Sequence, residues 1–272
     1  MRVALGQIPI SSEPQINLDR VRAAAVSAAG QGAEIAVFPE GTQARFSADL
    51  RAVAEPLDGP FCRGLAKIAA SAGVAIVASL FEPALDGRVY NTTVAYEADG
   101  SLAAVYRKIH LFDALGYCES QSVAPGDEVV IAGLAGLRVG FMTCYDVRFP
   151  ELARALAAGG ADLLVLPSAW AAGTFKEEHW VTLVRARAIE NTIWVAAAGQ
   201  VPDPAEPPTK APTGIGRSLL VDPMGVVRLD LGPAEGLGVG DVDTEQTAQV
   251  RAVLPSLAGR RTEIWLRGAA VS

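Results

Sequence analysis

The sequence predicts an α/β fold with some antiparallel strands. Strand-like apolar runs alternate with helical patterns along most of the chain. Runs such as DLLVLP (162–167) are almost continuously apolar, which is typical of strands buried on both faces. With 272 residues, 50% of them hydrophobic, the chain is long enough for one large domain or two small ones.

Each predicted element follows from its local pattern. In chain order we expect strands or helices as follows: strand 2–8, helix 14–30, strand 34–38, helix 61–73, strand 74–81, strand 137–144, helix 151–160, strand 162–167, helix 177–191 and strand 193–199. Between the third and fourth of these strands, VYNTTVAYEADG and SLAAVYRK share an ADGS turn, which predicts an antiparallel hairpin.

Two segments share one plan. GAEIAVFPEG (32–41) and GADLLVLPSA (160–169) both consist of Gly-Ala-acid, four apolar residues and a proline. We expect each proline to stop its strand, so that the next residues project from the carboxyl end, where α/β proteins commonly place active sites. The repeat favours two facing half-units, although two ordinary strand ends remain an alternative.

No linker divides the chain, so we expect one domain over 1–272. Segment 200–216 is rich in Pro and Gly and predicts a long surface loop that could border a pocket. From about Leu254 a tail carries Ile264, Trp265 and Leu266, which have few local apolar partners. The sequence leaves open whether this tail packs on a partner subunit or on its own domain.

Charge and cysteine content argue against several classes of protein. The net charge is −7 without a Lys/Arg-rich block, which disfavours binding to nucleic acid or anionic membranes. Cys62, Cys118 and Cys144 form no CxxC pair, so neither a zinc cage nor a disulfide framework is indicated. The N-terminal apolar run ends at Pro9, and no apolar stretch reaches the ~20 residues of a membrane span. We expect a cytoplasmic protein.

Cys144 lies where a strand is predicted to end and a helix to begin, in FMTCYDVRFPE (141–151). A strand–turn–helix junction exposes a side chain and directs backbone N–H groups at the atom it attacks. A thiol with an ordinary pKa near ~8.5 needs a base for attack at neutral pH. From these residues alone, Cys144 is either such a nucleophile or a buried structural cysteine.

Other polar residues are candidates for helping this thiol. Glu40 follows a strand end, where partial desolvation would suit a general base, and Lys108 follows the hairpin, where its ammonium could stabilise an oxyanion. Taken alone, both residues fit a solvated surface position better, and the loop residue Glu119 is typical of the surface. His110 and His179 lack a supporting motif, so a Cys–His pair stays open.

The ordered set FPEG, YRKIHLFD and TCYDVRFPE resembles the three signatures of the nitrilase (carbon–nitrogen hydrolase) superfamily. The likeness continues through LPSAW, RARAIEN and GRSLLVDPMG and covers nearly the whole chain. It implies a four-layer αββα sandwich that assembles as a homodimer or larger homo-oligomer. It also implies a catalytic Glu40–Lys108–Cys144 triad, with Glu119 as a second glutamate.

The resemblance implies a mechanism without metal or organic cofactor. Cys144 attacks the amide carbonyl, Glu40 carries protons, and Lys108 with the backbone N–H of Tyr145 stabilises the oxyanion. Ammonia leaves, and water hydrolyses the resulting thioester, while Glu119 orients Lys108 or the substrate.

CYDVRFPE is closest to the small-molecule amidase branch of the superfamily. It implies a carboxylate-bearing amide, with deaminated glutathione first and an omega-amidase substrate such as α-ketoglutaramate or succinamate second. Arg45 is the candidate ligand for the carboxylate, and Trp170 either lines the pocket or packs in the core. Nitrile or N-carbamoyl hydrolysis and a catalytically silent binding or scaffold protein remain alternatives.

Overall fold

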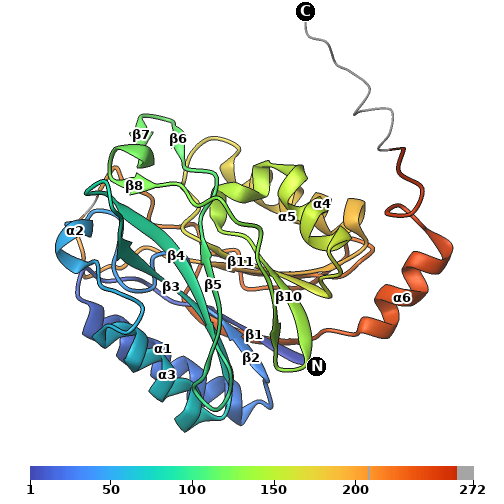
Figure 1. Cartoon of the computed structure of the whole chain (residues 1–272), viewed down its shortest axis with the longest axis horizontal. Helices are drawn as coiled ribbons and strands as arrows, with labels where there is room; N and C mark the ends of the chain where they lie inside the picture. The colour runs from blue at the N-terminus through green and yellow to red at the C-terminus, as the bar shows by residue number, and fades with distance from the viewer. Residues whose placement is uncertain (208, 262–272) are drawn as a thin grey trace, which may run out of the picture.

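The protein, described by a computed structural model over residues 1–207 and 209–261, is a sandwich of two sheets between two helical layers (Figure 1). Helices α1 (Pro14–Gly30) and α3 (Pro60–Ala72) cover one sheet, and α4 (Pro150–Ala158) and α5 (Lys176–Asn191) cover the other. This arrangement confirms the four-layer αββα sandwich.

Within the described residues, the sheets have seven and six strands. The first contains, in spatial order, β15 (Gly236–Asp241), β1 (Arg2–Gln7), β2 (Ile35–Val37), β3 (Ala75–Pro83), β4 (Val89–Tyr96) and β5 (Leu102–Arg107), with β8 (Val123–Ala124) beside β4. The second contains β14 (Val227–Asp230), β13 (Leu219–Val221), β12 (Trp194–Gly199), β11 (Leu163–Ser168), β10 (Leu137–Phe141) and β9 (Ile131–Leu134). The shorter elements are β6 (Asp113–Ala114), β7 (Tyr117–Cys118), α2 (Leu50–Val53), α6 (Thr244–Val253) and the 3₁₀ turns η1 (Glu119–Gln121) and η2 (Cys144–Arg148).

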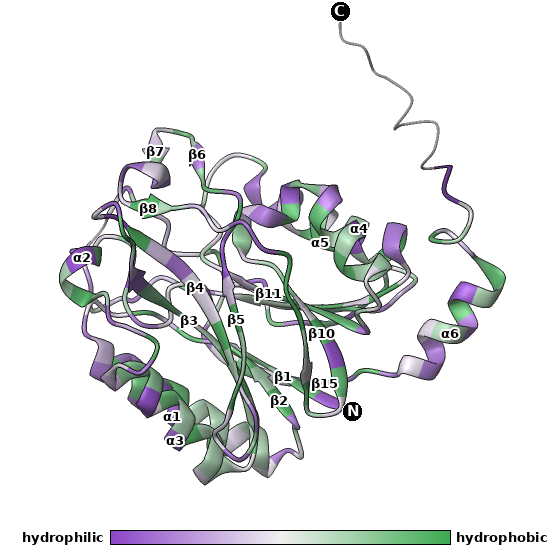
Figure 2. Cartoon of the chain, in the orientation of Figure 1, coloured by the Kyte–Doolittle hydropathy of each residue, from purple (hydrophilic) through white to green (hydrophobic). Residues whose placement is uncertain are grey.

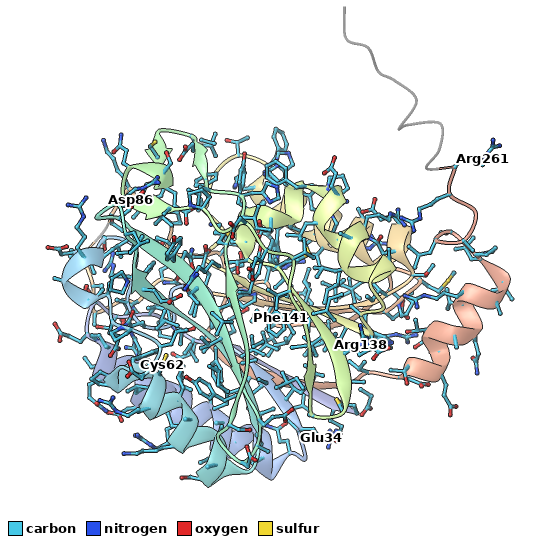
Figure 3. The ribbon with its side chains drawn as sticks, viewed as in Figure 1. Glu34, Cys62, Asp86, Arg138, Phe141 and Arg261 are labelled. Carbon is cyan, nitrogen blue, oxygen red and sulfur yellow. The ribbon has the colours of Figure 1, made fainter. Side chains whose placement is uncertain are left out.

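The strands of the first sheet are buried on both faces because each face meets a different core. Val3 belongs to the core that also contains Phe141 of β10, whereas its neighbour Ala4 packs with Val21 of α1. Hydrophobic residues accordingly dominate the strands between the helical layers in Figure 2, and Phe141 lies in the interior in Figure 3. Burial on both faces explains the almost continuous apolar runs of the sequence.

The repeated segments occupy equivalent places in the two sheets. β2 lies between the parallel strands β1 and β3, and β11 lies between the parallel strands β10 and β12. The predicted hairpin is also present, as the antiparallel pair β4 and β5. The two half-units predicted from the repeat therefore face each other across the central core.

Pro167 does not stop its strand, contrary to the expectation for the second segment. β11 continues to Ser168, which still pairs with Gly199 of β12. Val165 accepts a hydrogen bond from Met142 at the end of β10, so alternate residues of β11 face that neighbour. The backbone nitrogen of Pro167 points to the same side as that of Val165, but β10 has already ended there. The missing N–H of proline therefore costs the sheet no hydrogen bond.

Two C-terminal features fall outside the predicted elements. Helix α6 has only Thr247 and Val250 buried, so it lacks the apolar stripe by which helices are recognised. The usable signal is Asp243, whose side chain caps the helix, followed three residues later by Gln246. The tail residues 264–266 lie outside the described residues, so their packing stays a prediction.

Candidate active site

A cavity lies where β2, β10 and β11 end. All the predicted site residues except Arg45 line it, namely Glu40, Lys108, Glu119, Cys144, Tyr145 and Trp170. Residues from four separate parts of the chain therefore meet in one pocket.

Cys144 sits on a strained turn directly after β10. Its φ of 47° lies in the left-handed region, which costs a non-glycine residue roughly 1–3 kcal/mol. Thr143 and Asp146 form a capping box around η2, and α4 begins at Pro150. The predicted strand–turn–helix junction is thus present, and the hydrogen bonds of the capping box hold the strained cysteine in place.

A buried carboxylate–ammonium–carboxylate cluster lies beside Cys144. Lys108 Nζ lies 2.8 Å from Glu40 Oε1 and 2.8 Å from Glu119 Oε2, and all three side chains are at most 2% exposed. Removing such groups from water is costly unless they are paired and hydrogen-bonded. Here each carboxylate also has further donors, so the cluster holds its members in fixed positions.

The additional donors come from three different elements. Asn91 Nδ2 of β4 bridges Glu40 Oε1 at 2.8 Å and Glu119 Oε1 at 3.1 Å. The backbone N–H of Ala169, after β11, donates to Glu40 Oε2 at 2.9 Å, and that of Phe112 donates to Glu119 Oε2 at 2.7 Å. Asn91 was not among the predicted residues, and because Thr92 and Thr93 follow it in β4, the sequence alone does not single it out.

The electrostatics of the pocket favour a protonated thiol and a charged lysine. Burial raises the pKa of Cys144 well above its usual value, and the carboxylate of Glu40 raises it further, while Lys108 opposes this. Burial by itself lowers the pKa of Lys108, but Glu119 and Glu40 outweigh it and hold that pKa high. Burial also raises the pKa of Glu119. The resting thiol therefore needs a base, and a carboxylate lies next to it.

Neither histidine lines the pocket. His110 Nδ1 lies 2.7 Å from Asp146 Oδ1, and its ring stacks on Phe149 at 3.7 Å between centroids. His179 Nδ1 contacts the guanidinium of Arg148 at 3.4 Å. Both rings are thus engaged away from Cys144, which leaves Glu40 as the base that the geometry offers.

The other two cysteines also lie outside the pocket lining. Cys62 is buried in α3, as expected for a packing residue, and Cys118 is exposed on β7. Among residues 1–207 and 209–261, no group of three or more His, Cys, Asp or Glu side chains is placed to hold a metal ion. In the same ranges no helix is long and apolar enough to cross a membrane.

Trp170 and Arg45 differ in how they relate to the cavity. Trp170 lines it and also packs against Trp180, with 5.2 Å between ring centroids, so both readings of this residue hold. Arg45 donates to Glu206 Oε2 and to the carbonyl of Pro207, each at 3.0 Å. Its carboxylate-binding role stays a prediction, and the guanidinium already has an internal partner. The predicted loop does border the cavity, through Pro212.

Comparison with known proteins agrees with this geometry. The family model described as Carbon-nitrogen hydrolase matches residues 2–252. Hydrolase Rv0480c of Mycobacterium tuberculosis is 44% identical over 259 residues, 92% of each chain. Deaminated glutathione amidase of Escherichia coli O157:H7 is 37% identical over 265 residues, which is 96% of this chain and 97% of that protein.

A solved structure is also similar over the whole fold. It is a variant of the amidase from Nesterenkonia sp. AN1 in which acrylamide has undergone Michael addition at the active-site cysteine. Its TM-score is 0.82 with 29% sequence identity, covering 98% of this chain and 99% of that one. The chain belongs to the carbon-nitrogen hydrolase family and is a cysteine-dependent amidase.

Proposed function

We propose that the protein hydrolyses the amide bond of a small carboxylate-bearing amide through a thioester on Cys144. The observation that carries the proposal is that Cys144 lines one pocket with Glu40 and Lys108, whose Oε1 and Nζ atoms lie 2.8 Å apart. A thiol, a carboxylate and an ammonium are the groups that acyl transfer requires of a nucleophile, a proton carrier and an oxyanion donor.

In the first half-reaction the Cys144 sulfur bonds to the amide carbon while its proton passes to Glu40. The carbonyl electron pair moves onto oxygen, where the Lys108 ammonium and the backbone N–H of Tyr145 stabilise the negative charge. The carbon–nitrogen bond then breaks, and Glu40 returns the proton to the leaving nitrogen. The products are ammonia or an amine and a thioester.

In the second half-reaction Glu40 takes a proton from water, and the resulting hydroxide attacks the thioester carbon. The carbon–sulfur bond breaks, and the sulfur of Cys144 recovers its proton from Glu40. Glu119 Oε2 lies 2.8 Å from Lys108 Nζ and so helps to keep the ammonium charged and in position. Asn91 acts as a positioning residue for both carboxylates.

For the substrate we place a deaminated glutathione-like amide first. Supporting it are the CYDVRFPE motif and the relative from Escherichia coli that carries this activity in its name. An omega-amidase reaction on α-ketoglutaramate or succinamate is the alternative that the sequence raised.

A product screen tests the activity. Purified protein is incubated with deaminated glutathione, α-ketoglutaramate, succinamate, N-carbamoyl compounds and simple nitriles, and the acid product is measured by mass spectrometry. We expect turnover of carboxylate-bearing amides and its loss in Cys144→Ala. The exposed Cys118→Ala is the matched control and should keep wild-type rates. Wild-type turnover by Cys144→Ala would show that the nucleophile is assigned wrongly.

Location and assembly belong to the same proposal. We infer a cytoplasmic enzyme, supported by three free cysteines, one of them the buried nucleophile candidate. We also infer a homodimer or larger homo-oligomer, supported by the family membership. Light scattering of the purified chain tests the second inference, and a monomer at micromolar concentration would contradict it.

A further inference from the structure

Lys176 is a second buried cation in the active-site cavity, and the proposed reaction does not use it. It is the first residue of α5 and is 4% exposed, and it lines the cavity together with Cys144. Its ammonium lies 4.0 Å from the ring centroid of Trp170 and 5.2 Å from that of Phe112. The aromatic faces stabilise the positive charge but leave its hydrogen-bonding capacity free for a ligand.

In the described part of the chain, no carboxylate lies within ion-pair distance of Lys176. Lys108, by contrast, has two carboxylate partners in the same cavity. Burial lowers the pKa of Lys176, Cys144 acts in the opposite direction, and the guanidinium of Arg148 lowers that pKa further. Lys176 thus lacks a carboxylate partner among the described residues, whereas Lys108 is paired with two carboxylates.

The backbone around Lys176 adds to this conclusion. A positive side chain in the first turn of a helix is disfavoured because the N–H groups there carry partial positive charge. The backbone carbonyl of Lys176 accepts a 2.7 Å hydrogen bond from Trp170 Nε1, which fixes the start of α5 against the cavity wall. Burial, the polarity of the helix and the missing carboxylate partner all oppose a charged lysine at this place, and only the aromatic faces of Trp170 and Phe112 favour it.

We propose that Lys176 is the anion-binding residue of the substrate pocket and that it pairs with the carboxylate of the amide substrate. This inference rests on the proposed amidase function and deepens it, because it names the group that selects carboxylate-bearing amides. It also gives the carboxylate a partner inside the cavity, where Arg45 does not reach.

Arg148 extends the positive potential outward from Lys176. Both side chains line an adjoining cavity, which shares Phe112 and Tyr145 with the active-site pocket. The Arg148 guanidinium lies 5.0 Å from the centroid of Trp170, so two cations flank one indole ring. A carboxylate seated beside Lys176 would lie next to both charges, while the amide end of the substrate reaches Cys144.

The test compares two amides that differ only in charge. Succinamate carries a carboxylate, and 4-oxopentanamide replaces it with an uncharged acetyl group of similar size. The measured quantity is the ratio of kcat/KM for succinamate to kcat/KM for 4-oxopentanamide. A charge-assisted hydrogen bond corresponds to about a tenfold to hundredfold preference.

We expect Lys176→Met to lower this ratio about tenfold to a hundredfold, mainly through the KM for succinamate. Lys176→Arg keeps the charge and should keep most of the preference. Lys67→Met, an exposed lysine on α3, is the matched control and should keep the full ratio. An unchanged ratio in an active Lys176→Met protein overturns the inference.

The wild-type chain gives a second reading that does not depend on how a variant folds. If wild type hydrolyses both amides without preferring succinamate, the role of Lys176 is wrong and the amidase function stands. If wild type hydrolyses neither these amides nor the others in the product screen, the proposed function fails and the inference fails with it.

Discussion

The β2 segment (32–41) and the β11 segment (160–169) share a backbone plan but supply different chemistry. At the start of each, the acidic residue binds the neighbouring strand twice. Glu34 accepts from the N–H of Arg2 at 3.1 Å and donates its own to Arg2 O at 2.9 Å. Asp162 does the same with Arg138, at 2.9 and 2.7 Å. The Gly-Ala-acid motif therefore has one structural role in both sheets.

The two arginines extend this equivalence to the helices. The Arg2 side chain donates to the carbonyl of Gln31 at the end of α1, and that of Arg138 donates to the carbonyls of Gly159 and Gly160 after α4. A cation at a helix carboxyl end is favourable. Glu34 and Arg138 lie toward one end of the sandwich in Figure 3, away from Asp86 at the other.

The chemical difference between the segments lies in the residues after each proline. The β2 segment has Glu40 and Gly41 there, and the β11 segment has Ser168 and Ala169. The backbone N–H of Ala169 donates to Glu40 Oε2, so the second segment holds the carboxylate that the first supplies. The shared plan brings two strand ends together, and a few residues decide which of them carries the charge.

Replacing Glu40, the charged residue at the end of the β2 segment, should have the largest effect on activity. Glu40→Gln keeps the shape of the side chain but cannot accept the thiol proton, so we expect kcat/KM to fall about 10²–10⁴-fold. Initial rates on succinamate measure this loss. Glu34→Gln, in the same segment but at its exposed start, is the matched control and should stay near wild type. A Glu40→Gln protein within tenfold of wild type would show that both strand ends are structural.

Glu40→Gln should lower the activity but make the thiol of Cys144 easier to ionise. The Glu40 carboxylate helps to raise the pKa of Cys144, so its removal should lower that pKa and let thiolate form at a lower pH. We expect the pH midpoint of Cys144 alkylation by iodoacetamide to fall in Glu40→Gln. Peptide mapping distinguishes Cys144 from the exposed Cys118. A midpoint that rises or stays constant would mean that the charge of Glu40 does not act on the thiol.

We expect the smallest effect, a loss of stability, from replacing the acidic residues that start the two segments, Glu34 and Asp162. Glu34→Gln and Asp162→Asn each weaken one charge-assisted bond to a backbone N–H at the surface. We expect each to lower the free energy of unfolding by about 0.5–1.5 kcal/mol. Urea denaturation of both variants measures this. Values that differ by more than about 1 kcal/mol would argue against a common structural role.

Several site residues could be predicted because they stand at ends of strands that the sequence makes visible. Glu40 and Cys144 follow apolar runs, and Lys108 follows the hairpin. Asn91 could not be assigned a role, because it becomes a bridge only when β4 passes between Glu40 and Glu119. Lys176 lies just before the predicted helix 177–191 and could not be picked out, because it becomes buried only when it packs against Trp170.

The sequence by itself determined the α/β alternation, the repeated strand plan and the ordered motifs. These depend on local hydrophobic periodicity and on turn residues, which act over a few neighbouring positions. Only the tertiary structure decided which groups pair. The backbone N–H of Ala169 donates to Glu40 across the two sheets, and Arg45 pairs with Glu206. Lys176 has no carboxylate partner among the described residues and packs against Trp170 instead. Desolvation and charge pairing depend on contacts between distant segments, so they exist only once the chain has folded.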